Sequence, residues 1–216
     1  MKRKDTRSRK QQIMFITNFS ILLAIEAIVC FTPLGSIPLF GIVATLAMVP
    51  VIITAVLLGV KAGTLMGFFA GLFSFIVWSF MPFQPEIAFL FTPLVAPGNF
   101  YSLIICFVPR ILVGTVAGLT HQSFDKFLTP SKLKDSLQYG LAAILGSLTN
   151  TLLVVGGMIL FFGSYLVEEV PTLTVLLVFA GGIIITNGVL EAAIAFVLTI
   201  AISKPVNDYY LKRIEY

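Results

Sequence analysis

The chain has 216 residues, of which 58% are hydrophobic and only 11% are charged, and its formal net charge is +4. An ordinary soluble domain carries roughly 25% charged residues, so this composition excludes a typical water-soluble protein. Apolar segments of about 20 residues match the roughly 30 Å hydrocarbon thickness of a bilayer, where the backbone must satisfy its own hydrogen bonds. We therefore expect an all-α membrane protein that forms a single integral membrane domain over residues 1–216.

The sequence begins with a basic tail, residues 1–11, which six apolar stretches follow. Hydropathy and the placement of proline and glycine predict a bundle of six transmembrane helices. We expect these helices near residues 12–31, 42–59, 62–80, 100–122, 138–162 and 174–202. The first stretch is too long for a secretory signal and has no small-residue cleavage site, so we expect the mature protein to keep it. Pro50 and Pro109, in the second and fourth stretches, predict local kinks.

Lysine and arginine are concentrated in alternate connections. The N-terminal tail, the connection after the second stretch, the connection after the fourth stretch and the C-terminal tail together hold all but one of the fourteen basic residues. The positive-inside rule then predicts a multi-pass protein of the cell membrane with both termini in the cytoplasm. A basic tail beside a transmembrane helix is more typical of contact with anionic membrane lipid than of contact with nucleic acid.

The outer connections are rich in proline and glycine and yet strongly apolar. They are TPLGSIPLFG (residues 32–41) and MPFQPEIAFLFTPLVAPGN (residues 81–99). Because such segments do not favour open water, we expect them to fold back over the bundle. Small residues also repeat at helical spacing along three of the stretches, a pattern that allows helices to pack closely. They are Gly63, Gly67 and Gly71, then Gly114 and Gly118, then Ser20 and Ala24.

No pattern in the sequence predicts catalysis. Cys30 and Cys106 lie in apolar stretches at unrelated spacing, which predicts neither a disulfide nor a metal site. His121 is the only histidine and lies at the cytoplasmic end of its stretch, where a solvated imidazole is the ordinary interpretation. The HExxH, GxSxG and phosphate-loop patterns are absent. We therefore expect no enzyme, no cofactor and no ATP hydrolysis by a phosphate loop in this chain.

Three ionisable residues are predicted to lie within the membrane, where each costs roughly 2.5–3.5 kcal/mol and normally faces a cavity or a partner. They are Glu26, Arg110 and Glu191. In the segment FVPRILVG (residues 107–114), Arg110 lies in the outer half of the fourth stretch. Gly114 and Gly118 follow it on the same helix face and are predicted to leave space beneath the guanidinium. The alternative is that Arg110 forms an ion pair with Glu26 and only joins two helices.

Polar side chains of the fifth and sixth stretches can join Arg110. GSLTNT (residues 146–151) is the most polar patch within any stretch, and its Asn150 lies at a depth comparable to that of Arg110. Asn187 and Glu191 share one helix face, with Glu191 closer to the cytoplasm. A guanidinium in a low-dielectric pocket favours a carboxylate or phosphate, and amide side chains suit hydroxyls and amides. The residues therefore predict a cavity, open to the outside, for a small anion with further polar groups.

These features resemble the substrate-binding S components of energy-coupling factor (ECF) vitamin transporters. The resemblance extends over nearly the whole chain and includes FTPLGSIP (residues 31–38), the block TLAMVPVIITAVLLGVKAGTLMGFFAGLFSF (residues 45–75) and FVPRILVG. Within the family, the sequence is most similar to the pantothenate-specific members. That similarity implies that Arg110 and Asn150 line the ligand pocket.

The resemblance also implies a division of labour between subunits. An S component captures the vitamin from outside, while an ECF module of two cytoplasmic ATPases and a scaffold transmembrane subunit supplies the energy. Its first helix docks on the scaffold through an AxxxA motif, which Ser20 and Ala24 match here with Ala27 close by and with serine in place of the first alanine. The outer loops would form a lid, and the whole S component would topple in the membrane to release its vitamin.

Two other functions remain as alternatives. One is an S component for another vitamin such as riboflavin or folate, which would need more aromatic surface than pantothenate. Trp78 and the twenty phenylalanines could supply this surface. Trp78 is therefore a further candidate ligand residue. The other is a stand-alone secondary transporter. Such carriers usually have a duplicated pair of broken helices and an acidic ion site, whereas only the fourth stretch here shows a charged break.

Overall fold

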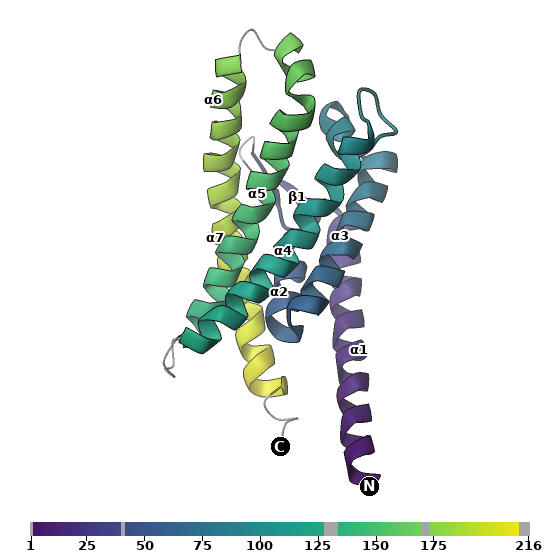
Figure 1. Ribbon diagram of the computed structural model, residues 1–216, viewed down its shortest axis with the longest axis vertical. Helices are drawn as coiled ribbons and strands as arrows, with labels where there is room; N and C mark the ends of the chain where they lie inside the picture. The colour runs from purple at the N-terminus through teal and green to yellow at the C-terminus, as the bar shows by residue number, and fades with distance from the viewer. Residues whose placement is uncertain (1, 40–41, 128–133, 170–172, 212–216) are drawn as a thin grey trace.

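The computed structural model describes residues 2–39, 42–127, 134–169 and 173–211, which form an elongated bundle of helices (Figure 1). Four long helices and one composite helical path make up most of it. The long helices are α1 (Lys2–Phe31), α3 (Val60–Phe80), α4 (Phe100–Phe127) and α5 (Lys134–Glu169). The composite path consists of α6 (Leu173–Ile183), the π-helical segment η3 (Ile184–Gly188), α7 (Val189–Pro205) and a second π-helical segment, η4 (Val206–Leu211).

Five helices of the described residues are long and apolar enough to cross a membrane. They are Gln11–Phe31, Val60–Phe80, Phe100–Phe124, Lys134–Leu166 and Ala180–Asp208. The structure thus confirms the helices that the sequence predicts near residues 12–31, 62–80, 100–122 and 138–162. The helix predicted near residues 174–202 is also present, but the π-helical segment η3 divides it.

The helix predicted over residues 42–59 is present only in its second part. Residues 36–45 instead contain a hairpin of two antiparallel strands, β1 (Ser36–Leu39) and β2 (Ile42–Thr45), after a short 3₁₀ turn, η1 (Pro33–Gly35). Only the following α2 (Met48–Leu58) is helical, and its 11 residues rise about 16 Å, roughly half of the hydrocarbon layer. The prediction of an all-α fold with six transmembrane helices was therefore incomplete.

Two residues mark the ends of the short helix α2. Pro50 lies in its first turn, where a backbone N–H has no helical partner, so the proline does not produce the predicted kink. Gly59 ends the helix with a φ of 93°, which glycine adopts without steric cost, and the chain turns there directly into α3. All residues from Met48 to Val56 are buried. Hydropathy cannot tell such a buried core helix from one that faces lipid.

The direction of the helices shows how the second crossing is made. In Figure 1, α1 and α3 both run upward, and the chain returns between them through the hairpin and α2. The start of α1 and the end of α7 lie toward the lower end. The end of α4 and the start of α5, which are consecutive along the chain, lie there too. The described ends of the chain, the end of α4 and the start of α5 therefore lie at the same end of the bundle.

Helices α3 and α4 pack closely, and glycines on both let the two backbones approach each other. A Cβ atom added at Gly63 would meet the backbone of Gly114, and one added at Gly67 would meet the backbone of Arg110. A Cβ at Gly118 would meet the first residue of α3. Gly114 and Gly118 thus pack against α3 and leave no space beneath the guanidinium. That prediction is wrong, and close helix packing accounts for both glycines.

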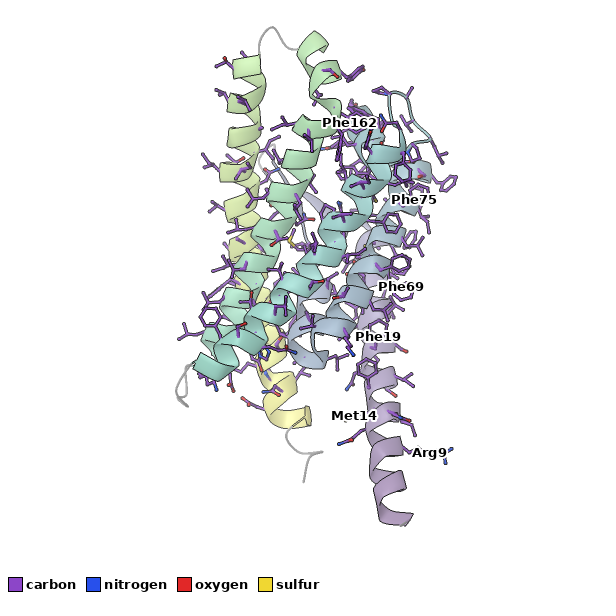
Figure 2. The ribbon with its side chains drawn as sticks, viewed as in Figure 1. Arg9, Met14, Phe19, Phe69, Phe75 and Phe162 are labelled. Carbon is purple, nitrogen blue, oxygen red and sulfur yellow. The ribbon has the colours of Figure 1, made fainter. Side chains whose placement is uncertain are left out.

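The outer segment of residues 81–99 folds back over the bundle, as its composition predicts. It contains a 3₁₀ helix, η2 (Pro85–Leu90), and its residues Ala88 to Thr92 are buried. Ser102 in α4 donates a hydrogen bond of 2.6 Å to the carbonyl of Phe89, which ties the segment to the bundle. Phe89 to Phe91 belong to an apolar cluster at the upper end, where Figure 2 labels Phe75 and Phe162.

Candidate functional site

A cavity lies where α1, η1, α2, α3, α4 and α5 meet the segment of residues 81–99. The cavity has a volume of about 80 Å³, several times the roughly 10–15 Å³ that a single water needs. Apolar residues from several elements form most of its wall. Its polar side chains are Ser74 from α3, Arg110 from α4 and Asn150 from α5. This arrangement, apolar walls with a few convergent polar groups, is typical of a small-molecule site.

Arg110 reaches the cavity from α4 and is held by two contacts. Its Nη1 donates a hydrogen bond of 3.0 Å to the backbone carbonyl of Ile105. Its Cζ lies 5.0 Å from the ring centroid of Phe91, within the range of a cation–π interaction. Phe91 in turn stacks on Trp78, with ring centroids 4.8 Å apart. The guanidinium therefore lies against a backbone carbonyl and a supported aromatic ring.

Asn150 lies on α5 and lines the same cavity, with 8% of its surface exposed. Among the described residues, its side-chain amide has no hydrogen-bond partner. A buried amide is costly unless its donor and acceptor are satisfied. Its position beside the cavity makes a bound molecule a suitable partner.

The structure brings three of the four predicted ligand residues together. Arg110, Asn150 and Trp78 line one cavity, whereas Asn187 lies in η3 and is not among the lining residues. One turn further along, Glu191 is 7% exposed and accepts a hydrogen bond of 3.1 Å from Thr151. The ligand role of Asn187 stays a prediction.

Sequence reasoning missed Phe91 as a partner of Arg110. It lies in FLFTPL, part of the apolar segment expected to fold over the bundle, and that expectation was the signal that could have found it. Cys30 of α1 and Ser74 of α3 also line the cavity and were not predicted to. The spacing of residues along one element does not indicate which aromatic or small residues of another element they will contact.

Glu26, the alternative partner of Arg110, is bound differently. Its carboxyl group is fully buried and its Oε1 accepts a hydrogen bond of 3.2 Å from the thiol of Cys30. Its Oε2 has no hydrogen-bond partner among the described residues. No ion pair joins Glu26 and Arg110 among the described residues. The observed geometry therefore gives no support to an ion pair that joins the two helices.

The predicted docking residues lie on an uncovered part of α1. Ser20 and Ala24 are exposed and Ala27 is half-buried. The inner face of α1 packs on α3, where the rings of Phe19 and Phe69 lie 6.4 Å apart; Figure 2 labels both. The small-residue pair Ser20 and Ala24 is thus available to another protein, and Ala27 is turned partly toward the bundle.

Among the remaining reactive residues, His121 lies apart from the cavity and the two cysteines are buried. His121 lies at the end of the bundle that carries the described termini, as a half-buried side chain whose ring stacks on that of Tyr139 with centroids 5.4 Å apart. Cys30 and Cys106 are both buried free thiols. Within the part of the chain that the structure describes, no three His, Cys, Asp or Glu side chains are grouped to hold a metal ion.

The bundle, with its five helices long and apolar enough to cross a membrane, is that of a multi-pass membrane protein. Residues 14–203 match the family described as ECF transporter, substrate-specific component, and the chain therefore belongs to this family. The chain is also 35% identical over 172 residues to the pantothenic acid transporter PanT of Lactococcus lactis subsp. cremoris, an alignment that covers 76% of this chain and 77% of that relative. Both findings agree with the resemblance that the sequence shows.

Proposed function

We propose that this S component binds pantothenate in the cavity between α2, α3, α4 and α5. The observation that carries the proposal is the guanidinium of Arg110 at the wall of an apolar cavity, with the unpartnered amide of Asn150 in the same wall. Pantothenate is a carboxylate that also carries hydroxyls and an amide. Arg110 suits the carboxylate and Asn150 suits the neutral polar groups. The similarity to a pantothenic acid transporter supports the same substrate.

Riboflavin and folate are less suitable ligands for the observed cavity. A large planar ring would need free aromatic surface on which to stack. The ring of Phe91 is already in contact with Trp78 and with the guanidinium of Arg110. A flavin or pterin would have to displace one of these contacts, whereas a flexible small carboxylate would use Arg110 where it lies.

The direct test is a binding screen of the purified protein in detergent against pantothenate, riboflavin, folate and other B vitamins by titration calorimetry. We expect saturable one-site binding of pantothenate and no measurable heat with the other vitamins. Preferential binding of another vitamin would assign the cavity to that compound. A protein that accumulates pantothenate in vesicles without any ATPase partner would favour the stand-alone secondary transporter.

We further propose that the whole chain acts as one membrane domain with both termini in the cytoplasm, where an ECF module of two ATPases and a scaffold subunit docks on it. The excess of lysine and arginine at the end of the bundle that carries the termini supports this orientation. The lysine and arginine side chains of the N-terminal tail are also suited to contact with anionic lipid at the cytoplasmic surface. ATP hydrolysis would belong to the partner subunits.

Docking through α1 can be tested by filling its small-residue surface. Ala24→Trp should abolish or strongly reduce pantothenate uptake in proteoliposomes that contain the ECF module, because an indole at this exposed position prevents close helix contact. Its pantothenate affinity in calorimetry should change less than about twofold, since Ala24 does not line the cavity. The matched control is Leu160→Trp, an exposed position on α5, which should transport normally. Normal uptake by the Ala24 variant would remove this surface from the interface.

A further inference from the structure

The interior of α4 contains a proline, and its effect falls on one carbonyl. In an α-helix, the N–H of each residue donates to the carbonyl four residues earlier. Pro109 has no N–H, so it leaves the carbonyl of Ile105 without this helical bond. Both Ile105 and Pro109 are buried. A buried backbone carbonyl without a partner is costly, and nearly all such groups in folded proteins find one.

The next residue in the sequence supplies the missing donor. The Nη1 of Arg110 lies 3.0 Å from the carbonyl oxygen of Ile105 and donates to it. A guanidinium has five N–H donors in a fixed planar fork, and this bond uses only one of them. The ring of Phe91 lies 5.0 Å from Cζ and limits the position of the group from another element. The donors that remain can serve a ligand in the cavity that Arg110 lines.

We infer that Pro109 is a positioning residue for the ligand carboxylate: by removing its own N–H from α4, it leaves the Ile105 carbonyl to hold the Arg110 guanidinium at the cavity wall. The inference rests on the proposed function, because the group that it positions is the proposed carboxylate ligand. A long arginine side chain has many rotamers, and a group that is ordered before the ligand arrives loses less entropy on binding. The pair Pro109 and Arg110 thus combines the anchor and the binding group in two consecutive residues.

The test is Pro109→Ala, which restores the N–H and lets the Ile105 carbonyl take an ordinary helical bond. Titration calorimetry compares pantothenate with panthenol, its analogue in which an uncharged alcohol replaces the carboxylate. We expect the preference for pantothenate over panthenol to fall roughly 3- to 10-fold, the range of one hydrogen bond. The affinity for panthenol should stay within about twofold, and the melting temperature should not fall, because the helix gains a bond.

Pro205→Ala is the matched control. Pro205 also lies inside a helix, near the end of α7, but Val206 follows it and it does not line the cavity. This variant should leave the preference between the two ligands unchanged. If Pro109→Ala weakens both ligands by the same factor, the proline shapes the helix and does not position the carboxylate group, which overturns the inference. An unchanged preference overturns it as well.

A measurement without ligand separates this inference from the proposed function. Nuclear magnetic resonance on protein with isotope-labelled arginine reports the motion of the Arg110 guanidinium, which should be restricted in the wild type and mobile in Pro109→Ala. If the wild type binds no pantothenate while the proline still restricts this motion, the proposed function fails and the anchor stands. If the wild type binds pantothenate while motion and preference are the same in both proteins, the anchor fails and the function stands.

Discussion

Asn150 and Thr151 are neighbours on α5, and yet they belong to two different polar regions of the molecule. Asn150 lines the cavity beside Arg110 and has no partner among the described residues. Thr151 faces α7, where its hydroxyl donates a hydrogen bond of 3.1 Å to Glu191. Both side chains are almost fully buried, with 8% and 4% of their surfaces exposed. Burial alone therefore does not distinguish a binding group from a structural one.

The difference between the two regions lies in how their polar groups are satisfied. On the α7 side, a hydroxyl on one helix satisfies an acid on the other, so the hydrogen bond joins two elements. On the cavity side, Arg110 is anchored by its own helix and by Phe91, and it keeps donors that no described residue uses. Groups that are ordered but incompletely satisfied are suited to a ligand, whereas groups that are satisfied by each other are suited to stability.

Removal of Arg110 should give the largest change in binding. We expect Arg110→Ala to weaken pantothenate affinity about 100-fold or more, because a charge-assisted and often bidentate interaction is lost. Arg110→Lys should recover little of this loss, since an ammonium lacks the planar fork. Calorimetry provides the affinities, and size-exclusion profiles of the detergent-solubilised variants control for folding. An Arg110→Ala protein that binds pantothenate normally would remove Arg110 from the site and would favour interaction with Glu26.

The outline of the fold could be predicted from the sequence, because lipid imposes simple rules on it. Apolar runs of sufficient length, and the confinement of lysine and arginine to alternate connections, located the long helices and the end at which the termini lie. The hairpin at residues 36–45 and the short α2 could not be predicted in this way. Hydropathy measures how apolar a segment is and not whether its neighbours are lipid or protein, and α2 is surrounded by protein.

The candidate site could be predicted only in part, for a similar reason. A charge in an apolar helix pointed to Arg110, and depth along the helix added Asn150. Helical spacing says which residues share a face but not which element that face meets, so Gly114 was placed beneath the guanidinium when it packs on α3. Phe91 was missed because the path of its segment depends on the tertiary structure, although the expectation that this segment folds over the bundle indicated where to look.

Smaller and opposite effects should separate Asn150 from Thr151. Asn150→Ala should weaken pantothenate binding roughly 3- to 10-fold, the range of one or two neutral hydrogen bonds, without lowering the melting temperature, because no described residue depends on its amide.

Thr151→Val keeps the shape of the side chain but leaves the Glu191 carboxyl with one partner fewer. This loss should cost about 1–3 kcal/mol and lower the melting temperature, while pantothenate binding stays within about twofold. The readouts are calorimetry and thermal unfolding in detergent. A loss of binding in Thr151→Val equal to that in Asn150→Ala would show that the two regions form one site, and Asn187, which lies on the α7 side, would then be a ligand residue after all.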